Sequence, residues 1–338
     1  MSTAGQLDAA AFAELAEPHR HELQVHCYRM LGSFDDAEDA VQESLLRAWR
    51  QRASFEGRSP FRAWLYRIAT NACLDSLRRN TRRVLPQHVA PPNVPPEQVP
   101  DPGEVRWLQP YPDRLIDQAE SSPEAHAIAR ETIELTFIAA LQLLPSRQRA
   151  ALLVREVLGW SANETAVLLE TSVASVNSLV QRARATLQRN RPPRRTDWAA
   201  TTDATDQERA LLERFMRACE RGDAAAIVDM LGDDVRCTMP PYPWWFAGKA
   251  AVAESFRMGL GPYRPGEFRV VPTRANRQPA CATYVRVAGD TEYRAFAIDV
   301  LRIEHSQIVE VTAFHELALF EAFGLPLTVG LRTDETCG

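Results

Sequence analysis

The chain has 338 residues, and its 45% hydrophobic and 25% charged residues describe a soluble globular protein. This length is enough for two or three domains. The net charge of −5 averages segments of opposite sign, so it decides little about nucleic-acid binding. The six cysteines are scattered, without a CxxC pair or a His/Cys spacing that suits zinc. This cysteine pattern predicts buried, reduced thiols and no metal or cofactor. Because no signal peptide or long apolar run is present, we also expect a cytoplasmic protein without membrane association.

Residues 8–31 predict a helical pair that ends at Gly32-Ser33. The next helix, over residues 35–50, opens with acidic residues and carries an apolar stripe that includes Val41 and Leu45. Acidic residues in a first helical turn stabilise the helix dipole. That effect does not account for the apolar stripe beside them. We therefore expect an amphipathic helix with one buried face and one acidic face.

The stretch FEGRSPFRAWLYRIATNACLDSLRRNTRR, residues 55–83, predicts a loop at 54–60 followed by a helix with one apolar face. Aromatic residues and arginines are interleaved around that face. Aromatic rings beside guanidinium groups suit unstacked bases and phosphates. The alternative interpretation is that the aromatic rings form core and the arginines stabilise the helix C-terminus.

Residues 86–125 predict a linker, because PQHVAPPNVPPEQVPDPGE is too rich in proline to form a compact core. The linker ends in WLQPYPDRLID, residues 107–117, which is too aromatic for a mere spacer. An exposed cluster that contains Trp107 and Tyr111 usually packs against another surface.

Residues 126–190 predict a second helical module. One helix ends at Pro145, and another covers 147–157 with Gly159 just past its end. The run SANETAVLLETSVASVNSLVQRARATLQR, which follows, reads as a helix-turn-helix.

Two caps support this reading. Ser161 and Glu164 form a capping box for the first helix of the motif, and Thr171 or Ser172 caps the second. The second helix has a regular apolar stripe, whereas its other face carries short polar groups and then arginines. From residue 171 to 195 there are six arginines and no acid, which suits a surface that faces DNA phosphates.

Residues 191–206 predict a polar linker, and residues 207–332 predict an α+β domain. Its helices come first, followed by a strand near 234–239 and a turn rich in proline and aromatic residues, and then a further helix. Four strands are expected at 267–275, 280–287, 292–304 and 307–315.

The runs DDAEDAVQESLLRAWR and FEGRSPFRAWLYRIATNACLDSLRR resemble region 2 of an extracytoplasmic-function (ECF) sigma factor, the promoter-specificity subunit of bacterial RNA polymerase. The helix-turn-helix resembles region 4 of the same family. The resemblance implies that residues 1–85 and 126–190 are two all-α modules. It also implies two partners: core RNA polymerase, through the clamp helices and flap of its β′ and β subunits, and promoter DNA.

The resemblance also assigns residues to three surfaces. Polymerase binding is assigned to Asp36, Asp39, Gln42 and Glu43. Binding of the single-stranded −10 element is assigned to Arg58, Phe61, Arg62, Trp64, Arg67 and Asn71. Binding of the −35 element is assigned to Ser172, Ala174, Ser175, Asn177, Ser178, Gln181, Arg182 and Arg184.

The chain departs from the family pattern at three positions. Trp64 aligns with the first of two adjacent tryptophans in housekeeping sigma factors, and Leu65 replaces the second, which predicts a narrow promoter set. Glu170 stands where the family usually has a turn glycine, and a left-handed residue there costs roughly 1 kcal/mol without glycine. Asn177 stands where the family often has arginine, which argues against guanine readout at that point.

The third domain has MPPYPWWFAG after its first strand and closes with IVEVTAFHELALFEAFGLP, an order that resembles the SnoaL-like group of the NTF2 fold. This fold is a cone-shaped sheet with a pocket. Some relatives are cyclases or isomerases with an Asp/His pair, for which Asp299, His305 and His315 are the candidates. We expect His305 in an exposed turn and no enzymatic activity, because no catalytic constellation is legible.

A pocket for a small-molecule ligand or a docking partner is the expected feature of this cone. Its lining residues are expected to be Met239, Tyr242, Trp244, Trp245, Phe296 and Asp299. The alternative is that these aromatic side chains fill the cone as core.

The leading hypothesis is an ECF sigma factor whose activity is regulated by the fused SnoaL-like domain. In this family the segment between regions 2 and 4 threads the polymerase, and the alternative is that Trp107 and Tyr111 dock on this protein's own domains. Two other functions stay open: a helix-turn-helix regulator that acts without polymerase, and a SnoaL-type cyclase or isomerase with a DNA-binding appendage. The first leaves the acidic helix at 35–50 unexplained, and the second requires turnover of a small carbonyl substrate.

Overall fold

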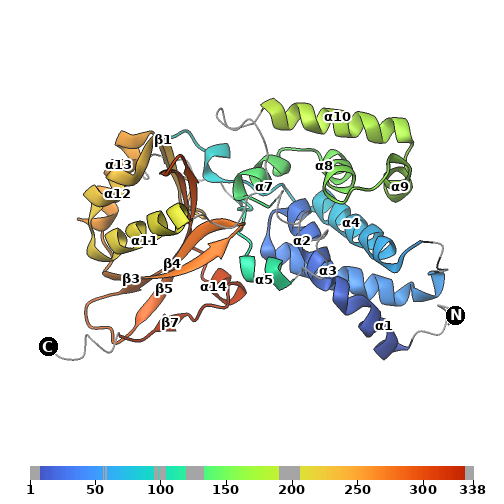
Figure 1. Ribbon diagram of the computed structural model, residues 1–338, viewed down its shortest axis with the longest axis horizontal. Helices are drawn as coiled ribbons and strands as arrows, with labels where there is room; N and C mark the ends of the chain where they lie inside the picture. The colour runs from blue at the N-terminus through green and yellow to red at the C-terminus, as the bar shows by residue number, and fades with distance from the viewer. Residues whose placement is uncertain are drawn as a thin grey trace. The chain divides into compact units, whose positions relative to one another are not determined.

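The structure, a computed structural model, describes residues 8–55, 57, 59–94, 98, 104–118, 133–189 and 206–331 (Figure 1). The chain divides into two compact units. Unit 1 comprises Met1–Arg83 and Arg114–Thr201, and unit 2 comprises Val84–Asp113 and Thr202–Gly338. Unit 1 is helical, whereas unit 2 is built on a sheet. Residues 84–113, which lie between the two helical modules in the sequence, therefore belong with the C-terminal domain.

The first helical module of unit 1 contains α1 Ala9–Ala16, α2 Arg20–Leu31, α3 Phe34–Arg50 and α4 Phe61–Arg79, with 3-10 turns at Glu17–His19 and Arg52–Ser54. The predicted break at Gly32-Ser33 is confirmed. Gly32 ends α2 with a left-handed φ of 71°, and the Ser33 hydroxyl accepts the amide of Asp36 at 3.1 Å, which caps α3.

The helices α2 and α4 are joined by a buried polar pair. The His26 Nε2 atom lies 2.9 Å from the Thr70 hydroxyl. Burial lowers the pKa of His26 to about 3, so this imidazole is neutral at physiological pH. The pair satisfies polar groups that would otherwise be costly to bury between the two helices.

The second helical module contains α7 Leu135–Gln142, α8 Ser146–Leu152, a π-helical turn Leu153–Val157, α9 Ala162–Leu168 and α10 Val173–Arg189, and a short helix α5 Asp113–Gln118 precedes it. The predicted capping box is confirmed. The amide of Ser161 donates to Glu164 at 2.8 Å, and the amide of Glu164 donates to the Ser161 hydroxyl at 3.2 Å. Glu170 adopts a left-handed φ of 49° in the turn between α9 and α10, as its place in the motif predicts.

Arg149 connects the two helical modules within unit 1. Its side chain is buried, and its guanidinium donates to the carbonyl of Met30 in the first module and to the carbonyl of Leu144 in the second. The same group bonds the side chain and the carbonyl of Gln142, and Gln142 in turn donates to the carbonyl of Arg29 at 3.4 Å. This network holds α2 against α7 and α8. A Cβ atom at Gly32 would lie 2.8 Å from the Gln142 side chain, so the close approach requires glycine.

Unit 2 is built on a sheet with the order β2-β1-β6-β5-β4-β3, and β7 pairs with β5. The strands are β1 Leu231–Thr238, β2 Trp245–Ala247, β3 Glu267–Ala275, β4 Gln278–Arg286, β5 Tyr293–Glu304, β6 Gln307–Phe314 and β7 Thr328–Val329. Strands β1 and β6 are parallel, and the other pairs are antiparallel. The helices are α11 Asp206–Arg221, α12 Ala224–Met230, α13 Lys249–Leu260 and α14 Ala318–Ala322. The expected α+β domain is confirmed.

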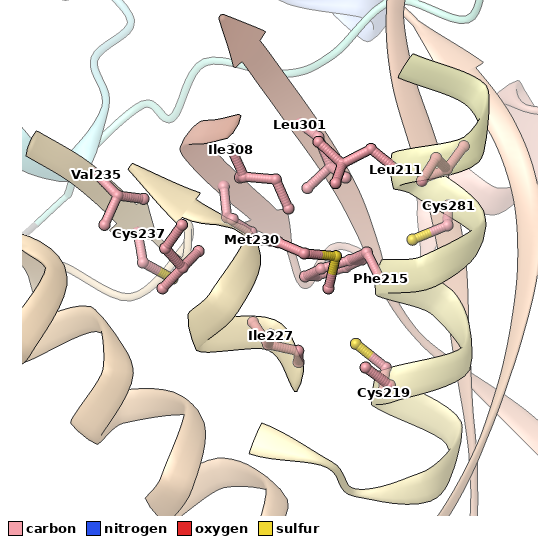
Figure 2. Packing of buried hydrophobic residues seen from close by; sticks show 14 of the residues in the cluster. Leu211, Phe215, Cys219, Ile227, Met230, Val235, Cys237, Cys281, Leu301 and Ile308 are labelled. Carbon is pink, nitrogen blue, oxygen red and sulfur yellow. The ribbon is translucent and has the colours of Figure 1, made fainter. Parts of the chain in front are cut away.

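The core of unit 2 lies between α11, α12 and the sheet. Figure 2 shows Phe215 of α11 next to Met230 of α12, within a buried cluster that also contains Cys281 of β4 and Leu301 of β5. Phe215 is 2% exposed, and burial of a side chain of this size stabilises the fold by about 1.5–3 kcal/mol. The helical spacing of the apolar positions in α11 thus provides one wall of the cone.

The five cysteines in the described part of the chain are buried, and none of them forms a disulfide with another. Among the described helices, none combines the length and the apolar character that a membrane span requires.

Candidate functional site

The acidic face of α3 is present at the surface, with part of its charge paired. Asp39 and Gln42 are exposed. Asp36 forms an ion pair with Arg83 at 2.8 Å, and Glu43 forms one with Arg47 at 2.6 Å. Of the four residues predicted to bind polymerase, Asp39 is therefore the acid best placed to meet a basic partner.

Two aromatic residues of α4, Trp64 and Tyr66, are buried in this state, and Phe61 is half-buried. Trp64 is 4% exposed and packs against Phe55 and Phe61, with ring centroids 5.2 and 5.5 Å away. Phe12 packs edge-on to Phe61 from α1 at 6.1 Å. Stacking of a base on Trp64 therefore requires Phe55 or Phe61 to move.

The polar residues predicted to bind the −10 element occupy three environments. Arg67 is exposed and Asn71 is half-buried. Arg62 is held by Glu22, whose carboxylate oxygens lie 2.8 and 3.0 Å from its Nε atom. Arg58 lies outside the described residues. The side chain of Arg62 is 40% exposed, but contact with DNA would require it to leave Glu22, which Arg67 and Asn71 do not need to do.

Helix α10 has the expected division into an apolar face and a polar face. Its inward residues Val176, Val180, Ala183 and Leu187 are buried. Ser172 caps the helix, because its hydroxyl accepts the amide of Ser175 at 3.2 Å. The residues that form the exposed face are Ala174, Asn177, Ser178, Gln181, Arg182 and Arg184, with Ser175 half-buried beside them.

One arginine of this face already has a partner. Arg184 is 2.5 Å from the Glu156 carboxylate in the preceding π-helical turn. Arg182, on the same face of α10, is also exposed. A DNA phosphate would therefore compete with Glu156 for Arg184 but not for Arg182.

The linker is docked on the C-terminal domain within unit 2. The main-chain amide of Tyr111 donates to the Asn276 side chain at 2.8 Å, and the Asn276 amide donates to the Tyr111 carbonyl at 2.9 Å. Asp113 accepts the amide of Arg277 at 2.8 Å. Gln109 donates to Glu316 at 2.7 Å. The motif WLQPYPD is therefore seated on the β3–β4 turn and on the segment after β6.

The tip of that β3–β4 turn is formed by Asn276 and Arg277, which have φ values of 56° and 58°. Two left-handed residues in a two-residue loop form the hairpin turn that suits the twist of antiparallel strands. Such tips normally face solvent, but Asn276 is fully buried and Arg277 is 3% exposed. Tyr111 and Asp113 of the linker contact these two residues and belong to the same compact unit.

The linker also closes on itself and contacts a second part of the domain. Val84 pairs with Trp107 in a parallel bridge, so the start and the end of the proline-rich run lie side by side. The indole of Trp245 donates to the Ala90 carbonyl at 2.8 Å. The Asn93 side chain accepts the amide of Ala247 at 2.8 Å and donates to its carbonyl at 3.1 Å.

Unit 2 contains a cavity of about 900 Å³. Met239, Trp244, Phe296 and Asp299, four of the residues predicted to line a pocket, do line it. The other two predicted residues, Tyr242 and Trp245, are not among its lining residues. Tyr242 is 42% exposed and stacks on Trp244 at 4.6 Å, and Trp245 is directed to the linker. The alternation of inward and outward residues along a strand could not show where these two side chains point. Tyr242 precedes β2, Trp245 begins it, and β2 has only three residues.

Two of the three candidate acid–base residues share the cavity. Asp299 accepts a hydrogen bond from the Thr283 hydroxyl at 2.7 Å, and burial raises the pKa of Asp299 to about 6. His315 packs edge-on to Phe296 at 4.9 Å, and burial lowers its pKa. His305 lies in the exposed β5–β6 turn with φ 50°, as predicted, and does not line the cavity.

The sequence analysis missed several residues that hold the linker: Asn93, Gln109, Asp113 and Asn276. The signals available were weak. Asn276-Arg277 lies between two predicted strands and indicates a hairpin turn, but a turn motif does not show what covers it. Asn93 follows two prolines and indicates only a loop.

Three family models match the chain. Residues 15–83 match Sigma-70 region 2, residues 135–187 match Sigma-70, region 4, and residues 212–311 match the SnoaL-like domain. The chain is 42% identical over 316 residues to the ECF RNA polymerase sigma factor SigG of Mycobacterium tuberculosis, which corresponds to 93% of this chain and 84% of that protein. It is 30% identical to the RNA polymerase sigma-H factor of Pseudomonas aeruginosa, over 55% of this chain and 89% of that protein.

The crystal structure of the Mycobacterium tuberculosis ECF sigma factor SigJ matches the fold, with a TM-score of 0.58 and 21% identity over 95% of this chain and 100% of that chain. The chain belongs to the family of ECF RNA polymerase sigma factors. Its two helical modules are sigma regions 2 and 4, and its third domain is SnoaL-like. The resemblance and the fold class predicted from the sequence are confirmed.

Proposed function

We propose that this protein binds core RNA polymerase through the acidic face of α3 and reads a promoter with α4 and α10. The observation that carries the proposal is the conjunction of the two sigma regions with an exposed polar face on α10 and an exposed Asp39 on α3. Region 2 supplies Arg67 and Asn71 at the surface for single-stranded bases and phosphates. Region 4 supplies short polar side chains and Arg182 for a duplex. We place this activity in the cytoplasm, where polymerase and chromosome meet.

The C-terminal domain is regulatory rather than catalytic in this proposal. Asp299 and His315 share a cavity, which is the one observation that favours a cyclase or isomerase. However, His315 is packed against the rings of Phe296 and Tyr242, and Asp299 is bonded to Thr283. These contacts support a fixed lining rather than a proton relay.

Regulation acts through the reach of the linker. Regions 2 and 4 must separate to contact two promoter elements, and Arg149 holds them together in this state. The 23 residue steps from Val84 to Trp107 would span at most about 80 Å when extended. In the docked linker those two residues are paired, so this length is not available. Release of the linker from the C-terminal domain would therefore permit the open, promoter-bound form.

Selection from a library of promoter fragments randomised at the −10 and −35 positions tests the proposal. We expect the full chain to enrich a defined sequence pair only when core RNA polymerase is present. Charge reversal at Asp39 should reduce enrichment severalfold, whereas charge reversal at the exposed Glu213 of the C-terminal domain should leave it unchanged. Equal enrichment by the full chain without polymerase would instead support a helix-turn-helix regulator that acts alone.

A further inference from the structure

We propose that the cavity of the C-terminal domain binds a small, mainly apolar molecule with one hydroxyl or amine donor, and that this molecule holds the linker in its docked position through Asn93. This inference rests on the proposed regulatory role of the linker. It names the class of ligand that the cavity would bind and makes that ligand the factor that controls linker docking.

The cavity has the size and the lining of a small-molecule site. Its volume of about 900 Å³ falls within the range of pockets that enclose drug-sized ligands. Its walls come from α11, β1, α13 and the strands β3 to β6. The side chains that dominate these walls are apolar: Phe215, Met239, Trp244, Phe256, Phe268 and Phe296. A ligand would therefore gain most of its affinity from burial of apolar surface.

Asp299 supplies a hydrogen-bonding point in the cavity, which the polar residues Ser255, Thr283 and His315 also line. The Asp299 Oδ2 atom accepts from the Thr283 hydroxyl at 2.7 Å, and both residues line the cavity. A carboxylate has acceptor sites on both oxygens and no donor. A ligand group that meets Asp299 must therefore donate a hydrogen bond, which a hydroxyl or an amine does. A ligand carboxylate would be repelled by Asp299 and by Glu254 at the same cavity.

One residue of the docked linker also lines the cavity. Asn93 is fixed there by three hydrogen bonds, since its amide donates to the Trp245 carbonyl at 2.9 Å and its side chain bonds both main-chain groups of Ala247. It adopts a left-handed φ of 61°, a conformation that asparagine tolerates better than most residues. The linker thus pairs with β2, and Trp244, directly before β2, lines the same cavity.

Because Asn93 is part of the wall only while the linker is docked, a ligand that touches it has more contacts in the docked form. A ligand shifts an equilibrium only through such a difference in affinity. Coupling between two sites is reciprocal, so the docked linker must also tighten ligand binding. The ligand would therefore act to keep regions 2 and 4 together and lower transcription.

The test uses two fluorescent probes that differ in one donor, 1-pyrenemethanol and 1-methylpyrene, with the full chain. We expect 1-pyrenemethanol to bind about tenfold more tightly, the value of one hydrogen bond to a charged group. Asp299→Leu should remove that preference, and Thr283→Val, which keeps the carboxylate, should retain it. Equal affinity of the two probes for the unchanged chain would overturn the polar site.

The coupling to the linker is tested with Asn93→Gly, which keeps the left-handed backbone and removes the side chain. We expect this variant to bind 1-pyrenemethanol at least threefold more weakly and to speed amide exchange at Ala247. The exposed linker residue Val89 provides the control, because Val89→Ala should change neither quantity. Unchanged probe affinity in Asn93→Gly would overturn the coupling.

These readouts require no polymerase. If the probes behave as expected while promoter selection with polymerase fails, the proposed function fails and the binding site stands. If promoter selection succeeds and the probes bind equally, the site fails alone.

Discussion

Tyr111 and Asn276 exchange two hydrogen bonds, one from each main-chain amide, across 165 positions of sequence. This pair places the aromatic end of the linker on the tip of the β3–β4 hairpin. Docking of Tyr111 on the protein's own C-terminal domain is one of the two alternatives that the sequence left open, and it is the one present in this state. The pair therefore offers a direct way to weaken linker docking without altering either sigma region.

We predict that Asn276→Gly weakens linker docking while the hairpin stays folded. Glycine keeps the left-handed φ of 56° and removes the side chain that accepts the Tyr111 amide. The loss of one buried hydrogen bond costs about 1 kcal/mol, so amide exchange at Tyr111 should accelerate about fivefold. His305→Gly is the matched control, because His305 is also left-handed but lies in an exposed turn. Equal exchange at Tyr111 in both variants would contradict this role of Asn276.

Arg149→Met should separate regions 2 and 4 and lower the stability of unit 1. Methionine fills part of the volume, but the carbonyls of Met30, Gln142 and Leu144 lose their donor. Unsatisfied buried groups of this kind cost about 2–4 kcal/mol together. Thermal unfolding and small-angle scattering of the full chain would measure both effects. Arg182→Met, an exposed change in the same module, should alter neither the melting temperature nor the dimensions.

Asp39→Arg combined with Glu43→Arg is expected to weaken binding to core polymerase about tenfold at low ionic strength. Reversal of two charges slows encounter with a basic surface, and added salt should shrink the difference because it screens exposed charges. The charge-matched control is Glu213→Arg with Glu321→Arg, both exposed in the C-terminal domain. A similar loss in the control would show that net charge, rather than α3, governs the affinity.

Glu156→Gln is expected to strengthen promoter binding two- to fivefold, because it releases Arg184 for a phosphate contact. The present pair is 2.5 Å apart and partly exposed, so it is worth less than about 1 kcal/mol.

Arg182→Ala should weaken binding to all promoter sequences alike, since phosphate contacts position a protein without reading bases. Binding to a duplex series that varies in the −35 element would measure both. A change in sequence preference for Arg182→Ala would move that residue to the base-reading set.

Asp299→Asn should stabilise the C-terminal domain at pH 7.5 and much less at pH 4.5. Burial raises the pKa of Asp299 to about 6 from 3.8, so the folded state binds a proton more readily than the unfolded chain. Stability is therefore lost as pH rises from about 4 through 6, and the full penalty applies above that range. A shift of this size corresponds to about 2–3 kcal/mol at pH 7.5 and about 1 kcal/mol at pH 4.5. Calorimetry of the full chain would measure the stabilisation at the two pH values. Equal stabilisation at both would contradict a raised pKa of Asp299 as its cause.

The sequence predicted the elements well where a local signal fixes them. The break at Gly32-Ser33 and the Ser161–Glu164 capping box each depend on neighbours within four residues. The apolar stripe of α10 also follows directly from helical spacing. Five strands of unit 2 were predicted within three residues of their observed ends for the same reason, whereas the short strands β2 and β7 were not predicted.

The sequence could not predict which surfaces cover one another. Both Trp64 and Trp245 lie in aromatic-rich sequence. Trp64 packs against Phe55 and Phe61, whereas the indole of Trp245 donates a hydrogen bond to the linker. Arg149 binds the carbonyl of Met30 and Asn93 binds Ala247, and each of these partners lies more than 100 positions away. Periodicity reports that a side chain is buried, but the identity of the distant partner is decided by tertiary packing.

The bridge between Val84 and Trp107 has a consequence for how this linker can vary in length. The segment between Asn93 and Trp107 is held at both ends, by the hydrogen bonds of Asn93 and by this bridge, and doubling the length of a loop closed in this way costs only about 0.6 kcal/mol. Insertions and deletions there should be tolerated in related chains. The spacing from Trp107 to Asp113 is different, because contacts at both ends and at Gln109 and Tyr111 fix its register. A single residue added within that stretch would displace every contact beyond it.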